Sequence, residues 1–151
     1  MNQRFTLDGS EALEAQLGEL CHDAREGLFS VVPQGKIELL LLGGGYGRGE
    51  GGVLVTPDGE KPYNDLEFYL CLHGNTLLNE RRFGPAVHAL GERLTASAGL
   101  EVEFKIISIE KLRREPVSMF YYDLITGHRC IYGDPNRLAG CDHHRAAHRI
   151  P

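Results

Sequence analysis

A short apolar run that stops at three consecutive glycines constrains this fold more than any other feature. Ile37 to Leu42 contains five aliphatic residues and a single charged one, Glu38. A run of this length without polar alternation is typical of a strand that is buried on both faces of a sheet. Gly43, Gly44 and Gly45 then end the strand and allow close approach of the backbone to another group. We expect a central strand that leads into a tight glycine turn.

The glycine-rich stretch continues to residue 52 and has the composition of a phosphate-binding loop. Glycines allow backbone N–H groups to approach a phosphate, and a short helix starting at Gly45 or Tyr46 would add partial positive charge there. Arg48 could add a bidentate phosphate contact. No G-K-[S/T] follows, so the stretch is not a P-loop, and its glycine spacing does not fit a dinucleotide fingerprint. The alternative is a flexible turn without a ligand.

Two carboxylates interrupt the next apolar segment, which is expected to form a strand from Asp65 to Leu72. Residues two apart on a strand point the same way, so Asp65 and Glu67 share a face with Tyr69 and Cys71. Two carboxylates that face one spot repel each other unless a cation compensates them. The simpler alternative is the solvent-exposed face of an antiparallel sheet.

A third carboxylate, Glu103, repeats this arrangement on an expected strand from Glu101 to Ser108. If the two strands are neighbours, Glu103 can approach Asp65 and Glu67. Such a set of oxygen ligands suits Mg²⁺, or Mn²⁺, and supports metal-assisted phosphoryl or nucleotidyl transfer. Lys105 lies on the same face as Glu103, either in a surface ion pair or as a triphosphate contact.

The remaining periodicity completes a single α/β (α+β) domain with a small mixed β-sheet flanked by helices. A turn at Pro57-Asp58-Gly59 predicts a hairpin that starts at Val53. We expect helices from Ser10 to Leu28, from Pro85 to Ala98 and from Pro116 to Thr126. A short last strand is expected from Arg129 to Tyr132.

Composition limits the classes of partner. The 151 residues carry a net charge of −5, which disfavours nucleic acid as a partner, because a backbone-binding surface is usually basic. No apolar run approaches the roughly 20 residues of a membrane span, and the N-terminus lacks a signal pattern. The four cysteines form no C-x-x-C pair. We expect a cytoplasmic protein with reduced thiols and no membrane contact.

The order of these motifs resembles the DNA-polymerase-beta-like nucleotidyltransferase superfamily, including antibiotic nucleotidyltransferases and minimal nucleotidyltransferases. The run from Gly44 to Glu50, GGYGRGE, is similar to the family's Gly-Ser-x-x-Arg-Gly-Glu. The acid-apolar-acid-apolar strand corresponds to Asp65-Leu66-Glu67-Phe68, and the third-acid strand to Val102-Glu103-Phe104. The segment from Tyr122 to Asp134 is similar to the end of the family's catalytic domain, so the resemblance implies a catalytic domain over residues 1–135.

The resemblance implies a Mg²⁺-dependent enzyme, with Asp65, Glu67 and Glu103 as catalytic metal ligands. It would transfer a nucleoside monophosphate from an NTP, with ATP favoured, to a hydroxyl of an unidentified small molecule or protein. Gly44 and Gly45 would bind the nucleotide phosphates, with Arg48 and Lys105 as further candidates.

Three departures from the family pattern leave alternatives open. Nineteen residues separate Gly45 from Asp65, a longer spacer than is usual in the family, and Glu103 replaces the commoner Asp. The acceptor-binding helical domain is missing, so a homo-oligomer or a helical partner domain could complete the site. A non-catalytic, antitoxin-like module that acts through a protein partner is therefore a second hypothesis, and an unrelated α+β domain with solvated acids is a third.

Residues 136–151 are polar and rich in histidine. Their Cys141-x-His143-His144-x-x-x-His148 spacing is similar to that of a zinc site, because His144 and His148 would share a helix face. The favoured interpretation is a solvated tail, or the start of a missing helical domain.

Overall fold

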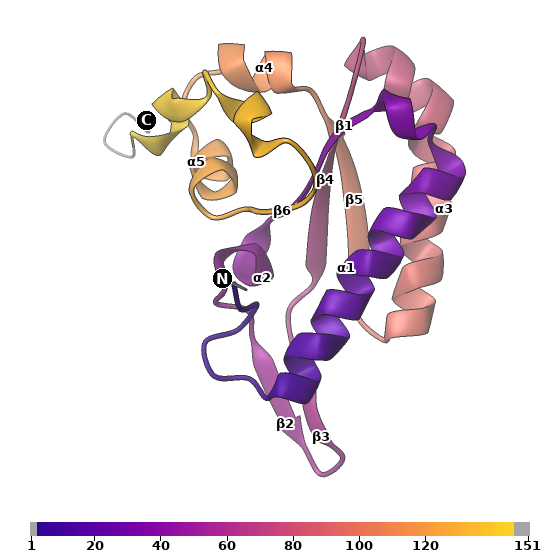
Figure 1. The fold of residues 1–151 in the computed structure, drawn as a ribbon, viewed down its shortest axis with the longest axis vertical. Helices are drawn as coiled ribbons and strands as arrows, with labels where there is room; N and C mark the ends of the chain where they lie inside the picture. Colours follow the sequence, from indigo (N-terminus) through magenta and orange to yellow (C-terminus); the bar gives the residue numbers. More distant parts are fainter. Residues whose placement is uncertain (1–2, 147–151) are drawn as a thin grey trace.

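The computed structural model describes residues 3–146, which form a three-layer arrangement of helices around one mixed sheet (Figure 1). The sheet has four strands in the order β5-β4-β1-β6. Its strands are β1 (Ile37–Leu42), β4 (Leu66–Leu72), β5 (Val102–Ile107) and β6 (Arg129–Gly133). The predicted fold class is confirmed. None of the helices within residues 3–146 combines the length and apolar character that a membrane crossing requires.

Strand β1 lies inside the sheet, as its apolar sequence predicts. It pairs antiparallel with β4 on one side and with β6 on the other, whereas β4 pairs parallel with β5. The side chains of β1 alternate between two separate cores: Leu40 and Leu42 belong to one, and Leu39 and Leu41 to the other. All four are almost completely buried. This double burial explains why the strand lacks polar alternation.

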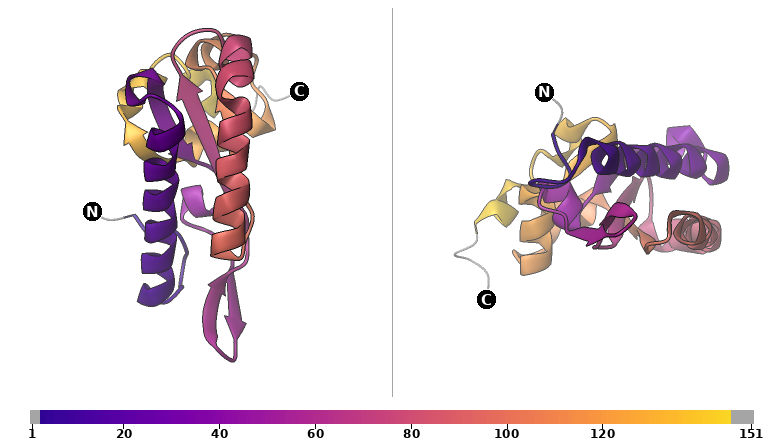
Figure 2. Two further views of the ribbon diagram at one scale, coloured as in Figure 1. Left: turned by 90° about the vertical axis from the view of Figure 1, so that its right-hand side faces the viewer. Right: turned by 90° about the horizontal axis from the view of Figure 1, so that it is seen from below.

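Helices α1 (Glu11–Val31) and α3 (Thr76–Ala98) lie side by side over the face that presents Leu40 and Leu42 (Figure 2). The Ser10 side chain caps α1 by accepting a hydrogen bond from the Leu13 N–H. Helix α3 starts nine residues before its predicted first residue, because Asn75 caps it and Pro85 lies inside it. A proline is usually taken as a helix start or break, and this preference misplaced the boundary.

The opposite face is covered by α4 (Ile109–Arg114), α5 (Met119–Thr126) and the segment that follows β6. Helix α4 was not predicted, and α5 begins three residues later than expected. The prediction of a solvated tail is wrong for residues 136–146. Leu138, Cys141 and His144 are buried there, and the short helical turns η2 (Pro135–Leu138) and η3 (Asp142–Arg145) order the segment.

Two histidines dock this segment, although their spacing suggested a metal. The Nε2 atoms of His143 and His144 lie 2.9 and 2.6 Å from the carbonyl oxygens of Glu115 and Leu112. These carbonyls lie at the end of α4, where a helix leaves its C=O groups without intrahelical partners. The zinc-like spacing thus serves helix capping here, and His148 lies outside the described residues.

The predicted hairpin is present as β2 (Val53–Thr56) and β3 (Gly59–Pro62), which form a separate two-stranded sheet. It projects away from the main sheet at the end where β4 begins (Figure 1). A third short helical turn, η1 (Gln34–Lys36), joins α1 to β1.

Thr95 of α3 binds the first backbone N–H group on the free edge of strand β5. Its hydroxyl accepts a hydrogen bond from the Val102 N–H at 2.9 Å and lies 2.7 Å from the Gly91 carbonyl. Since unpaired backbone groups at a sheet edge invite pairing with other chains, this side chain both protects the edge and joins it to the helix.

We therefore expect Thr95→Val to lower the free energy of unfolding by about 1–3 kcal/mol, because the Val102 N–H loses its acceptor without a change of side-chain shape. Urea denaturation followed by circular dichroism measures this. Thr126→Val is the matched control, since the Thr126 hydroxyl is exposed and donates to the Tyr122 carbonyl within its own helix. Equal losses in both variants would contradict a special role for Thr95.

Candidate active site

The glycine turn and the acidic strand meet at one end of the sheet. Because β1 and β4 are antiparallel, the last residue of β1, Leu42, lies opposite Phe68 near the start of β4. The Gly43 N–H continues the ladder by donating to the Glu67 carbonyl at 2.9 Å. Two motifs 20 residues apart in the chain are therefore joined directly by backbone pairing.

The parallel pairing of β4 with β5 brings the third acid to the same place. Glu67 lies directly opposite Glu103, and Tyr69 lies opposite Lys105. Asp65 immediately precedes β4, two positions before Glu67, and the Leu66 N–H donates to the Glu101 carbonyl at 2.9 Å. The predicted neighbourhood of the two acidic strands is confirmed at the level of the backbone.

A small pocket of about 160 Å³ opens between the glycine turn, β4 and α5. Gly44 and Glu67 form one wall, and Arg48 lies at its side. The remaining lining residues are Gly43, Tyr69, Phe120, Asp123 and Leu124. The pocket combines a backbone turn, a carboxylate and a guanidinium, the types of group that bind a metal-nucleotide complex.

The hydroxyl of Tyr69 lies 3.3 Å from the Glu67 carboxylate. Burial raises the pKa of Tyr69, and the negative charges of Glu67 and Glu103 raise it further. The hydroxyl therefore stays protonated at neutral pH and donates to Glu67. This contact holds the Glu67 side chain on the pocket side of the sheet.

Helix α2 (Gly44–Arg48) follows the turn and starts one residue before the predicted position. Gly44 has a φ of +64°, and a Cβ there would lie 3.4 Å from the Glu67 carboxylate. Gly45 packs beside Gly51 and does not line the pocket. Arg48 does line the pocket, and its guanidinium lies 3.8 Å from the Glu50 carboxylate. The left-handed backbone at position 44 thus favours glycine.

The other predicted site residues lie nearby without converging on one point. Asp65 and Glu103 are exposed, and Lys105 lies with its Nζ 5.9 Å from the centre of the Phe120 ring. Within residues 3–146, no group of three or more His, Cys, Asp or Glu side chains is arranged as a metal site. The chemistry of the donors nevertheless suits a hard cation, because all three are carboxylates at one end of neighbouring strands.

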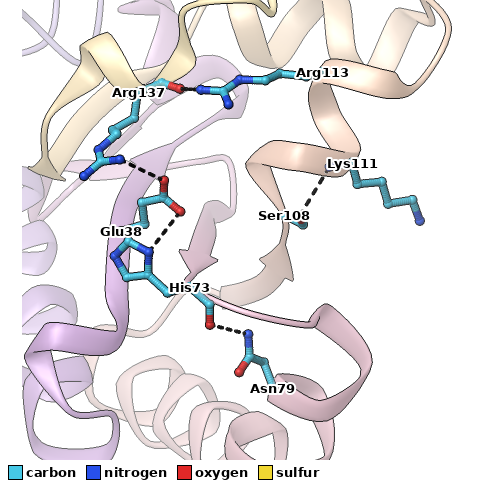
Figure 3. Close-up of polar contacts among 7 residues, drawn as sticks. All are labelled: Glu38, His73, Asn79, Ser108, Lys111, Arg113 and Arg137. Atoms are coloured by element: carbon cyan, nitrogen blue, oxygen red, sulfur yellow. Dashed lines mark hydrogen bonds and ion pairs between the residues drawn. The ribbon is translucent and has the colours of Figure 1, made fainter.

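His73 lies at the opposite end of the sheet, because it follows the last residue of β4. Figure 3 shows its imidazole directed toward Glu38, with a 3.6 Å contact. Arg137 lies 3.9 Å from the other oxygen of Glu38, and the Asn79 amide donates to the His73 carbonyl. This cluster joins α3 and the segment after β6 to the central strand. It lies at the end of the sheet away from the pocket that contains Glu67.

Sequence analysis missed four pocket residues: Tyr69, Phe120, Asp123 and Leu124. The signal for Tyr69 was present, since it follows Glu67 by two positions on the same strand face. The other three come from α5, which reaches the pocket by tertiary packing against α2 and against the Tyr69 ring. No local pattern could have revealed that contact.

Comparison with known proteins supports the fold without identifying a family. No protein-family model matches the sequence, and no curated protein matches it. Among solved structures, the chain is similar to a chain in a complex of a tri-AMPylated HEPN toxin from Shewanella oneidensis with an MNT antitoxin. The TM-score is 0.50 at 13% identity, over 87% of this chain and 85% of that chain. At this identity the likeness concerns the fold alone.

Gly47 provides a test of the tight packing beneath the turn. A Cβ at Gly47 would overlap the carbonyl oxygen of Leu42 and lie 2.9 Å from that of Gly127. We expect Gly47→Ala to lower the free energy of unfolding by about 1–3 kcal/mol, as overpacked sites do. Thermal unfolding measures the change.

The matched control is Gly18→Ala in the interior of α1, where a Cβ meets only a carbon of Phe5 at 3.9 Å. That variant should be more stable by about 0.5–1 kcal/mol, because glycine is a poor helix former. A neutral effect of Gly47→Ala would contradict the close approach of α2 to β1 and α5.

Proposed function

We propose that this protein is a Mg²⁺-dependent nucleotidyltransferase, which transfers a nucleoside monophosphate from an NTP to a hydroxyl group and releases pyrophosphate. The observation that carries the proposal is the register of three strands. It brings the glycine turn after β1 and the acids at the starts of β4 and β5 to one end of the sheet. The order of motifs that resembles the nucleotidyltransferase superfamily adds to this.

The acids need a cation in order to act together. Glu67 and Glu103 are register partners on adjacent strands, so their charges repel each other, and Asp65 adds a third charge beside them. A divalent ion would draw the three side chains inward and offset this repulsion. When bound, Mg²⁺ would polarise the α-phosphate, steady the leaving pyrophosphate and lower the pKa of the acceptor hydroxyl.

The protein's own groups would bind and orient the nucleotide. Gly43 and Gly44 line the pocket and leave room for phosphate oxygens, Gly45 continues the same turn, and Arg48 adds a cation at the side of the pocket. Lys105 on β5 would approach the phosphates from the side of Glu103. In this structure the Lys105 ammonium lies over the Phe120 ring and does not line the pocket.

A protein is the acceptor that the surroundings favour. Met119 and Phe120 are 59% and 43% exposed on α5, and Phe120 forms part of the pocket wall. Exposed apolar side chains beside a pocket are typical of a surface that contacts another macromolecule. The structurally similar complex contains an AMPylated toxin and an antitoxin, and this supports a protein as the acceptor.

The second candidate function is a non-catalytic, antitoxin-like module that binds a protein partner. The same exposed residues on α5 favour it, as does the toxin–antitoxin complex among the structural neighbours. The two functions differ in one requirement: only the enzyme needs metal and nucleotide at the three carboxylates.

Thermal unfolding with Mg²⁺ and a non-hydrolysable ATP analogue tests the enzyme. A ligand that binds only the folded state stabilises it, by about 2.7 kcal/mol at a hundred times its Kd. We expect a rise in Tm that requires both Mg²⁺ and nucleotide. Asp65→Asn and Glu67→Gln should abolish the rise, because each removes a charged metal ligand.

Glu19→Gln is the control, because Glu19 is an exposed acid on α1, away from the pocket. It should leave the rise intact. A wild-type protein whose Tm is unchanged by any NTP analogue at millimolar Mg²⁺ would contradict the enzyme and leave the binding module as the better hypothesis. The same measurement with non-hydrolysable analogues of GTP, CTP and UTP shows which nucleotide the protein prefers.

A further inference from the structure

Tyr46 lies between the glycine turn and the acidic strand. It belongs to α2, and its side chain is buried in the core that α1 and α3 share with the sheet. The neighbouring positions 44, 45 and 47 are glycines, so Tyr46 carries the only large side chain among residues 43–47. A single aromatic residue is therefore responsible for fixing this part of the loop.

The Tyr46 hydroxyl makes three hydrogen bonds. It donates to the Gly52 carbonyl at 2.7 Å, and it accepts from the N–H groups of Tyr63 and Asn64 at 2.9 and 3.0 Å. The Asn64 side chain adds a fourth bond to the same junction, since its Oδ1 accepts from the Gly52 N–H at 2.6 Å. One hydroxyl thus joins both ends of the segment that carries the hairpin.

This junction explains how the long spacer is accommodated. The hairpin β2–β3 occupies most of the chain between the glycine turn and Asp65, and it projects from the end of the sheet (Figure 1). A flexible excursion of this length would leave Asp65 free to move. Because Tyr46 binds Gly52 where the chain leaves and Asn64 where it returns, the excursion is closed at its base.

The Tyr46 ring and the Asn64 side chain leave no room for a side chain at the two glycines of the junction. A Cβ at Gly51 would overlap the ring, and a Cβ at Gly52 would lie 2.6 Å from the Asn64 Oδ1. The junction is therefore built from residues on both sides of the hairpin, and its glycines have a structural explanation independent of phosphate binding.

We propose that Tyr46 is a positioning residue, whose hydroxyl fixes the backbone before Asp65 and so holds that carboxylate at the metal site. The inference rests on the proposed function. The two N–H groups that donate to the Tyr46 hydroxyl belong to Tyr63 and Asn64, the residues immediately before Asp65. The hydroxyl therefore restricts the backbone that carries the Asp65 carboxylate. Tyr46 itself does not line the pocket.

Tyr46→Phe tests this by removing the hydroxyl and keeping the buried ring. The affinity for Mn²⁺ is measured by electron paramagnetic resonance, with a non-hydrolysable ATP analogue at saturation. We expect the Kd for Mn²⁺ to rise roughly three- to tenfold, the range that corresponds to the net value of one hydrogen bond. The Kd for the analogue in EDTA should stay the same, because the phosphate-binding turn is untouched.

Hydrogen exchange supplies the second measurement. The amides of Tyr63 and Asn64 should exchange faster in Tyr46→Phe, whereas those in the middle of α1 should not change. Tyr63→Phe is the matched control: it makes the same chemical change at the base of the hairpin, on a side chain that is 68% exposed. It should alter neither the exchange nor the Mn²⁺ affinity.

The outcomes separate this inference from the proposed function. Faster exchange at Tyr63 and Asn64 with an unchanged Kd for Mn²⁺ in Tyr46→Phe would overturn the positioning role alone. Equal weakening of Mn²⁺ binding and of analogue binding in EDTA would also overturn it, because it would indicate a general loss of structure. A wild-type protein that binds no Mn²⁺ with nucleotide would overturn the proposed function and this inference together.

Discussion

The pairing of β4 with two different neighbours is the constraint on which the site depends. Its antiparallel pairing with β1 places the start of β4 beside the end of β1, where the glycine turn lies. Its parallel pairing with β5 places Glu103 beside Glu67 in register. A slip of one residue in either ladder would turn the acids to the face covered by α1 and α3, where charged groups would be costly to bury. The apolar cores on both faces therefore fix the geometry of the acids.

Sequence reasoning succeeded where side-chain periodicity alone decides the structure. The alternation from Asp65 to Leu72 correctly separated the residues that pack on α1 and α3 from Tyr69 and Cys71, which face the other core. It misplaced the start of α3 because it took Pro85 as the helix start and overlooked the local cap at Asn75. It also failed where tertiary contacts decide. The polar segment with His143 and His144 is ordered by carbonyls at the end of α4, and this contact leaves no local pattern in the sequence.

The candidate site was predictable as a set of residues but not as a complete environment. Asp65, Glu67, Glu103 and the glycine turn could be selected from their spacing, because strand geometry relates residues two apart. The wall formed by Phe120 and Asp123 could not, because it depends on where α5 packs. The directions of the acidic side chains could not be predicted from the sequence either, because they depend on which charges and hydrogen-bond donors surround them.

The two ends of the sheet treat their carboxylates differently, and this contrast bears on function. At one end Glu38 lies 3.9 Å from the guanidinium of Arg137, so the protein itself supplies a cationic partner for this carboxylate. At the other end, no ion pair within 4 Å joins Asp65, Glu67 or Glu103 to a cationic side chain of residues 3–146. Glu67 receives instead a neutral hydroxyl from Tyr69. Under the proposed function, a bound divalent ion would supply the positive charge that these carboxylates lack.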